Sequence, residues 1–256
     1  MFKKIILASA LAISSTFASW DLFPVLESHK GQTRFISYYS TYSDEGKQGH
    51  SLNFSLGSRY TVYPNLELAL AVPYHAFTFY DGKKIGTDGT GTIGLLTRYQ
   101  FISTMNVFAD VYFPNRNDCY RDDPWYFNIG LQFSRKINPL FNFGSELSIE
   151  FSTKDDDGDI PLDAFAAFEL DFTITEKFAP YIKTNGHLTL GEYSEREHGY
   201  QFSNGGGDLF LASYIGVKYD FNETFSTDAS AGISRYVNVE NYPTVFSAKL
   251  AFLFNF

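Results

Sequence analysis

Residues 50–74 decide the fold, and they read HSLNFSLGSRYTVYPNLELALAVPY. From Leu52 to Val62 every second residue is apolar or aromatic, with only Ser58 breaking the row, and small or polar residues fill the positions between. This period of two predicts a β-strand with one apolar and one polar face. Residues 63–65 then turn the chain, and the alternation resumes from Leu66 to Tyr74. The stretch therefore predicts an antiparallel hairpin.

The same pattern recurs along the chain and predicts twelve strands. They lie near residues 33–42, 50–62, 66–79, 90–101, 106–114, 125–135, 141–152, 163–174, 179–190, 208–221, 225–235 and 244–256. Short connections alternate with longer polar ones along the whole chain. An even number of strands, with short turns at one end and long loops at the other, is typical of an outer-membrane barrel.

A period of two does not say which face looks outward, so a secreted β-sandwich or a lipocalin-like barrel with an apolar interior is an alternative. Two features favour the membrane barrel. Aromatic residues gather on the apolar face near the short turns, where an interfacial girdle would lie. They are Tyr60, Tyr99, Phe101, Phe133, Phe141, Phe172, Tyr219, Phe221, Phe225 and Phe254. The last strand is also amphipathic and ends on Phe256, as in proteins that the barrel-assembly machinery recognises.

The first residues have the three parts of an export signal. Lys3 and Lys4 precede the apolar run 5–13, and small residues follow up to Ala18. We predict a signal peptide over residues 1–18 and a single barrel domain over residues 19–256. Residues 19–32 are too few for a substantial plug, although they could tuck into the mouth of the barrel.

Composition limits the classes of function. The chain holds 27 Phe and 18 Tyr but only 2 Met and 1 Cys, which favours pleated structure. A mean hydropathy of −0.17 does not exclude a barrel whose faces alternate. The net charge of −9 argues against a nucleic-acid partner, because a phosphate backbone calls for basic stripes. The lone Cys119 cannot form an internal disulfide.

If the apolar face meets lipid, the other face lines the lumen and carries nearly all the strand charges. We predict that these charged residues line a permeation path. They are Arg59, Glu67, Arg98, Asp110, Glu146, Glu150, Glu169, Asp171, Lys183, Lys218, Asp220, Asp228 and Lys249. Opposing charges would orient a polar solute in an open lumen; alternatively, they pair and fill a narrow interior.

Four further residues are predicted to lie on the lumen face toward the outer mouth, where they could guide an aromatic or apolar solute. They are Tyr39, His75, Phe77 and Phe79. Ordinary packing under the loops is the alternative interpretation of these four.

Motifs for catalysis or cofactors are weak. Residues 89–94 satisfy G-x-G-x-x-G, but they open a strand rather than a helix, which a dinucleotide site requires. The acidic loop 155–159 has its glycine in the wrong place for an EF-hand. The five histidines lack metal-ligand spacing, and no serine stands out as a nucleophile. We predict no cofactor, no metal and no catalytic residue, with an outer-membrane hydrolase as a remaining alternative.

Residues 59–60, 66–74, 89–95 and 98–99, which include the runs LELALAVPY and GTGTIGL, resemble the MetA-pathway of phenol degradation family of outer-membrane barrels. One departure is Thr92, where that family tends to carry an acid after the second glycine. The resemblance implies an exported barrel of about twelve strands that passes small compounds, aromatic or hydrophobic ones among them.

The sequence thus predicts an outer-membrane channel for passive diffusion of small solutes. A structural or surface-interaction barrel with a closed lumen is the main alternative. The expected partners are outer-membrane lipid and lipopolysaccharide, the barrel-assembly machinery through the strand that ends at Phe256, and a small-molecule permeant.

Overall fold

A computed structural model describes residues 22–44, 46–85, 88–113, 125–153, 159–196, 199–203, 206–239 and 242–256. Within them, twelve long antiparallel strands form the wall. These are β1 (Gly31–Asp44), β2 (Lys47–Tyr63), β3 (Leu66–Tyr80), β6 (Ile93–Ile102), β7 (Met105–Phe113), β8 (Tyr126–Asn138), β9 (Phe141–Ser152), β10 (Asp159–Phe172), β11 (Phe178–Arg196), β13 (Leu209–Asp220), β14 (Phe225–Tyr236) and β15 (Val245–Asn255).

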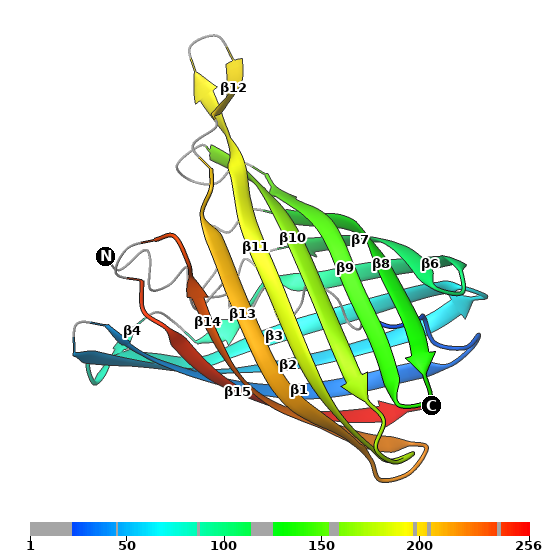
Figure 1. The fold of residues 1–256 in the computed structure, drawn as a ribbon. Coiled ribbons are helices and arrows are strands. Elements are labelled where there is room, and N and C mark those ends of the chain that lie inside the picture. Colours follow the sequence, from blue (N-terminus) through cyan, green and yellow to red (C-terminus); the bar gives the residue numbers. More distant parts are fainter. Residues whose placement is uncertain are drawn as a thin grey trace.

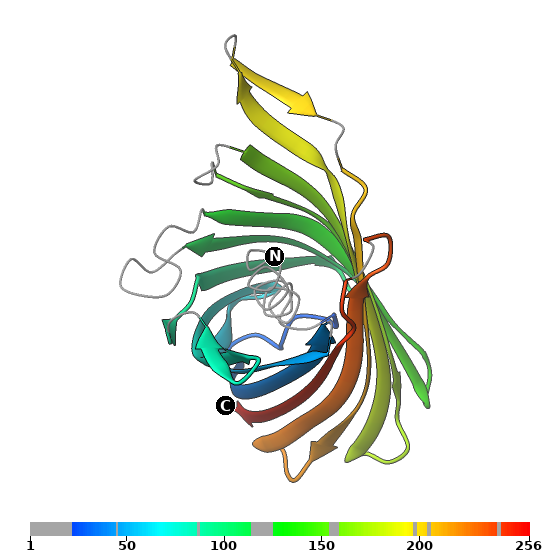
Figure 2. The same cartoon turned by 90° about the vertical axis from the view of Figure 1, so that its left-hand side faces the viewer.

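Each long strand pairs with its neighbours in the chain, and β1 pairs with β15 to close the ring. Figure 1 shows the barrel from the side, and Figure 2, turned by 90°, shows its wall curving around an interior. The prediction of an all-β, up-and-down antiparallel barrel with twelve strands is confirmed. Closure removes the free strand edges that an open sheet would expose.

The two ends of the barrel differ. Short connections, such as Pro64 and Asn65 between β2 and β3, lie at one end together with Gly31 and Phe256; we call this the turn end. The other end, which we call the loop end, carries three short strands: β4 (Lys83–Ile85), β5 (Gly89–Thr90) and β12 (Gly199–Ser203). There β11 runs on to Arg196, past the predicted limit of residue 190, and its hairpin with β12 projects beyond the rim (Figure 1).

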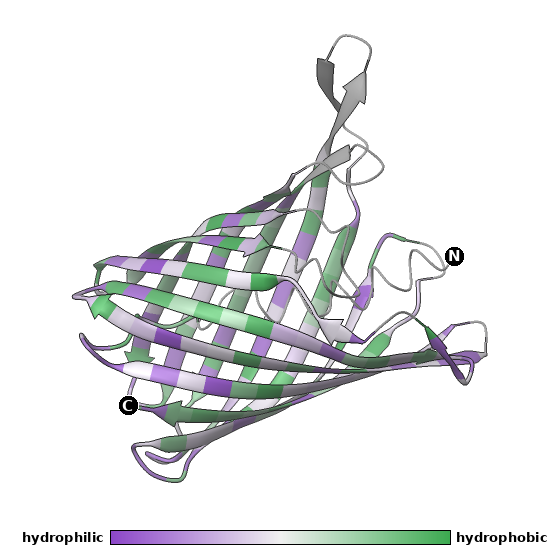
Figure 3. Ribbon diagram, turned by 180° about the vertical axis from the view of Figure 1, so that it is seen from behind, coloured by the Kyte–Doolittle hydropathy of each residue, from purple (hydrophilic) through white to green (hydrophobic). Residues whose placement is uncertain are grey.

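The two faces of the wall have opposite chemistry, as the period of two predicts. In β2 the odd positions from Gly49 to Thr61 are all buried, whereas Leu56, Ser58 and Tyr60 on the even positions are exposed. The alternation of polar and apolar residues along the strands is visible in Figure 3. Leu, Ile, Val, Phe and Tyr dominate the exposed large side chains, so the outer wall suits lipid.

Outward charges are rare on the long strands. Where the structure describes the side chains, they are Arg135 near the turn end of β8 and Arg235 near the loop end of β14. Both residues lie near an end of the barrel and not in the middle of the wall, where a charge facing lipid costs most free energy. The described part of the chain contains no helix that is long and apolar enough to cross a membrane.

A β-bulge reverses the face that part of β3 presents. The register shifts between Leu52 and Asn53 of β2, which pair with Phe77 and His75 of β3, and Ala76 is the extra residue. Because a bulge inserts one residue into one strand, the parity of the side chains changes beyond it. His75, before the bulge, is buried on the inner face, and beyond the bulge the inner positions are Thr78 and Tyr80.

Several predictions fall on residues outside the described ranges. They are the signal peptide over residues 1–18, Cys119 and most of the acidic loop 155–159.

Candidate functional site

The charged residues predicted to line the lumen lie at positions of inner parity on their strands. Asp220, at the turn end of β13, is exposed at the rim instead of enclosed. Sequence reasoning missed further residues with the same orientation: Arg34 and Asp44 on β1, Asp163 on β10 and His187 on β11. All four share the parity of their neighbours on the inner face, so the same alternation would have found them.

Charge is segregated around the lumen. On β7 to β10, the described inner-face charges that are buried or half-buried are all acidic. They are Asp110, Glu146, Glu150, Asp163, Glu169 and Asp171. The buried and half-buried basic residues lie on the other strands, which also carry three acids of the inner face, Asp44, Glu67 and Asp228. The bases are Arg34, Arg59, Arg98, Lys183, Lys218 and Lys249. The acids outnumber the bases, so the described lumen is acidic as a whole.

The first polar network centres on Arg98 of β6, near the turn end. Its Nη1 donates to Glu67 Oε1 at 3.1 Å, and its Nε donates to Gln132 Oε1 at 2.9 Å. Gln132 Nε2 in turn donates to Glu146 Oε2 at 2.7 Å. Arg59 completes the network, with Nη1 3.5 Å from Glu67 Oε2. All of these side chains are at most 4% exposed, so the network links β2, β3, β6, β8 and β9 inside the barrel.

A second network lies on the facing strands. Lys218 of β13 donates to Glu169 at 2.6 Å and to Asp171 Oδ2 at 3.0 Å. Lys249 of β15 donates to Asp228 at 2.6 Å, and the same carboxylate accepts the hydroxyl of Tyr181 at 2.8 Å. Lys218, Lys249 and Asp228 remain partly accessible, whereas Glu169, Asp171 and Tyr181 are buried. The contacts of this network join β10, β11, β13, β14 and β15.

A third group lies closer to the loop end. His187 Nε2 is 2.7 Å from Glu150 Oε2 and 3.8 Å from Asp163 Oδ2. No described contact brings a serine, threonine or cysteine side chain next to the His187 imidazole, so a catalytic nucleophile is lacking among the described contacts. Among the described residues, no cluster of three or more His, Cys, Asp or Glu side chains could hold a metal ion.

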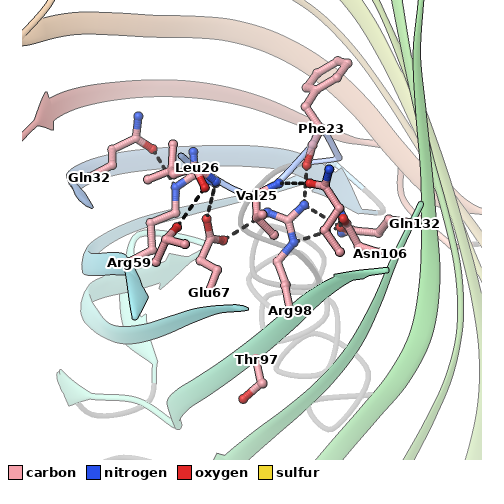
Figure 4. Close-up of polar contacts among 12 residues, drawn as sticks. Phe23, Val25, Leu26, Gln32, Arg59, Glu67, Thr97, Arg98, Asn106 and Gln132 are labelled. Carbon is pink, nitrogen blue, oxygen red and sulfur yellow. Dashed lines mark hydrogen bonds and ion pairs between the residues drawn. The ribbon is translucent and has the colours of Figure 1, made fainter. Parts of the chain in front are cut away.

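Residues 22–30 lie inside the turn end and cross the lumen. Near β1, the Thr61 hydroxyl donates to the Leu26 carbonyl oxygen at 3.0 Å, and the Leu26 amide donates to Glu67 Oε2 at 3.2 Å. The Val25 amide donates to Gln100 Oε1 at 3.1 Å, and Arg98 Nη2 donates to the Phe23 carbonyl oxygen. Figure 4 shows the segment passing beside Arg98 and Glu67, which contact Phe23 and Leu26.

The same segment reaches the opposite wall. Leu22, 1% exposed, packs with Phe165 and Ala167 of β10. Its backbone lies against Gly144 of β9, where a Cβ atom would be only 2.8 Å from Leu22 Cβ. Lys218 Nζ of β13 sits 4.7 Å from the centre of the Phe23 ring. The segment thus joins walls that are about half a circumference apart in the strand order.

Of the four residues predicted to face the lumen at the outer mouth, the structure places one inside the barrel and three on its outer face. His75 faces inward, with Nδ1 2.5 Å from Asn53 Oδ1 and Nε2 2.9 Å from the Thr78 hydroxyl. Phe77 and Phe79 face outward, and their predicted lumen position is wrong because the bulge at Ala76 reverses the parity.

Tyr39 also faces outward and is 39% exposed, so its predicted lumen position is wrong as well. Its hydroxyl lies 3.0 Å from His50 Nδ1, which belongs to the outer row of β2. The inner row of β1 holds the even positions, including Tyr38 and Tyr42, and Tyr39 belongs to the odd row. A run of neighbouring tyrosines hides this parity in the sequence.

Other aromatic side chains occupy the inner face at the loop end. Tyr42 and Tyr80 stack with ring centres 6.3 Å apart, on either side of Gly49 in the strand register. Tyr236 meets Tyr242 edge-on at 4.7 Å. We call these four residues the tyrosine belt. The lumen at the loop end is therefore lined by aromatic rings as well as by the charged group around His187.

Comparison with solved structures identifies the fold of the wall. One match is the COG4313 outer membrane channel from Pseudomonas putida F1, with a TM-score of 0.66 and 12% identity; it covers 91% of this chain and 98% of that one. The translocator domain of the autotransporter NalP from Neisseria meningitidis matches with a TM-score of 0.56 and 9% identity, over 99% and 96% of the two chains. At these identities the likeness shows an outer-membrane barrel fold and nothing finer.

No family model and no curated protein matches the chain.

Proposed function

We propose that this protein is an outer-membrane channel for passive diffusion of small solutes, with aromatic or hydrophobic compounds among them. One solved structure that it resembles over most of its length, that from Pseudomonas putida F1, is described as an outer membrane channel, which supports this class of function. Kinship with the MetA-pathway of phenol degradation family is part of the proposal and rests on residues 59–99.

The segregation of charge across the lumen carries the proposal. A barrel that merely needed a filled interior could pair its charges anywhere, yet here the buried and half-buried inner-face charges of β7 to β10 are all acidic. The bases lie on the remaining strands, together with a few acids such as Glu67 and Asp228. Opposite charges on facing walls create a field across the lumen, and low-dielectric walls focus it. A dipolar solute entering such a lumen would be oriented as it passes.

The tyrosine belt supports the entry of aromatic solutes. Tyr42, Tyr80 and Tyr236 present rings on the inner face at the loop end, and each is less than 10% exposed. Aromatic rings favour edge-to-face or offset contacts with other rings. A small aromatic solute could exchange contacts with the belt before it meets the Arg98 network near the turn end.

Purified protein in planar bilayers tests the proposal. We expect discrete conductance steps, and liposomes that contain the protein should admit a small solute such as phenol faster than empty liposomes. The matched control is the Tyr42→Ala and Tyr236→Ala double variant, which should retain ion conductance but lose part of the advantage for phenol over glycerol. Complete absence of conductance and solute flux in several lipids, from protein shown to be folded, would refute the channel.

A closed structural barrel is the second candidate, because one observation favours it. The network around Arg98 is almost fully buried, and residues 22–30 lie across the same level of the lumen. A permanently filled turn end would explain both facts without any permeant. The bilayer experiment separates the two candidates, since only the channel conducts.

The cellular setting follows from the same proposal. We propose export by the signal peptide over residues 1–18, insertion by the barrel-assembly machinery that recognises the strand ending at Phe256, and contact of the outer wall with lipid and lipopolysaccharide. The turn end, which holds both Gly31 and Phe256, would then face the periplasm.

A further inference from the structure

We infer that residues 22–30 form a displaceable plug that closes the turn end of the lumen, and that its departure opens the channel. The inference rests on the proposed function, because a plug has a role only in a conducting barrel. Three observations carry it: a seat shaped for the segment on the wall, anchors on opposite strands, and the absence of the segment from the described sheet.

The seat is Gly144. This residue lies on the inner face of β9, and the three atoms nearest to a Cβ placed there are Leu22 Cβ at 2.8 Å, Leu22 O at 2.9 Å and Phe23 Cε1 at 3.2 Å. All three belong to the segment and none to the barrel wall. A side chain at position 144 would therefore meet the segment before it meets any atom of the wall.

The anchors hold the segment across the lumen rather than along one wall. Arg98 donates to the Phe23 carbonyl oxygen, and Glu67 accepts the Leu26 amide. At the far side, Leu22 packs on β10 and the Phe23 ring lies under Lys218. A solute that travels through the turn end would meet this backbone in its path.

The segment can leave without unfolding the barrel. It belongs to no described strand, and only Leu22 and Phe23 of its residues are buried. Its described backbone-to-backbone hydrogen bonds to the wall lie next to β1, where His29 and Lys30 bond to Thr61 of β2. The positions next to β1, from Glu27 to Lys30, are exposed. Residues 22–28, which have few buried side chains and lie outside the sheet ladder, can therefore open at low free-energy cost while the core stays intact.

Arg98, Glu67 and Lys218 also have partners on the wall, so they need not become isolated charges when the segment leaves. Arg98 retains Gln132 and Glu67, and Lys218 retains Glu169 and Asp171. The wall contacts thus lower the cost of release, because an unpaired buried charge would be strongly unfavourable.

The first test fills the seat. In Gly144→Val, the new side chain should displace Leu22 and raise the fraction of time the channel conducts in planar bilayers by about 5- to 150-fold, the range expected for overpacking of one site. The control is Gly186→Val, which adds the same side chain to the outer face of β11, where the nearest atom is the flexible end of Leu211 at 3.1 Å. This control should conduct like the parent protein.

The second test locks the plug. Leu22→Cys and Gly144→Cys, combined in a Cys119→Ser background, place two thiols close enough for a disulfide after a small shift. The oxidised protein should stay closed, and reduction with dithiothreitol should raise conductance above the parent's level, because the freed side chain at position 144 then competes with the segment for space.

The outcomes distinguish this inference from the channel itself. If the parent, Gly144→Val and the oxidised lock all conduct alike, the plug is refuted and the channel stands. If all remain silent although each migrates on gels as a folded, heat-modifiable barrel, both are refuted. An increase in Gly144→Val together with closure of the oxidised lock supports the plug.

Discussion

Gly31 and Phe256 exchange two backbone hydrogen bonds, from Gly31 N to Phe256 O at 2.8 Å and from Phe256 N to Gly31 O at 3.0 Å. These bonds extend the β1 and β15 ladder to the last residue, so the two ends of the barrel domain meet at one seam. The Phe256 ring also covers the Cα of Gly31, where there is no room for a Cβ.

Deletion of Phe256 should therefore weaken the seam. Loss of two backbone hydrogen bonds predicts a decrease of roughly 1–3 kcal/mol in the free energy of unfolding, measured by urea titration of the folded barrel in liposomes. Phe256→Leu keeps both backbone bonds and should stay within about 0.5 kcal/mol of the parent protein. Equal stability of the deletion and the parent would show that the seam does not depend on this residue.

The Arg98 and Glu67 pair should contribute far more to stability than a surface pair. Glu67→Gln leaves Arg98 and Arg59 facing a neutral amide in a buried site, and breaking a buried pair of this kind costs roughly 3–5 kcal/mol. Lys84→Gln is the matched control, because Lys84 pairs with Asp88 at 2.6 Å while 47% of its side chain is exposed. The control should cost about 1 kcal/mol or less. The same urea titration measures both, and equal effects would contradict a buried, structural role for Glu67.

How far the sequence could predict the structure is clear from β2 and β3. The alternation from Leu52 to Val62 was enough to define the strand, its faces and the inward position of Arg59, because a period of two has few physical interpretations. The same alternation placed Phe77 on the wrong face. One extra residue at Ala76 reverses the parity, and a bulge leaves no mark in a local pattern of apolar residues.

The plug was beyond sequence reasoning for a different reason. Leu22 meets Gly144 across 122 positions of chain, through a contact that depends on the diameter and closure of the barrel. A strand pattern defines neighbours along and between adjacent strands but not contacts across a lumen. A short segment of 22–30 offers no periodicity of its own, so only its position next to β1 suggested that it could enter the mouth.

The reversed parity beyond Ala76 predicts that Phe77 faces lipid. In a variant whose two natural Trp residues are replaced by Phe, a single Phe77→Trp should be quenched strongly by brominated lipids. Thr78→Trp, one residue further along β3, should be quenched much less, because Thr78 is 6% exposed and faces inward. The opposite order of quenching would place the bulge elsewhere.

The segregated lumen charges predict the direction of ion selectivity. Acids outnumber bases on the described inner face, so the open channel should prefer cations, measured as the reversal potential across a KCl gradient at low salt.

Glu150 and Lys249 make a matched pair of tests, since their side chains are 24% and 23% exposed and they stand on the acidic and basic sides. A unit charge about 8 Å from a permeating ion contributes about 0.5 kcal/mol in water, which is a roughly twofold change in selectivity. Glu150→Gln should lower the ratio of cation to anion permeability by about that factor, and Lys249→Gln should raise it. Shifts in the same direction, or none from either variant, would mean that ions do not pass between these two walls.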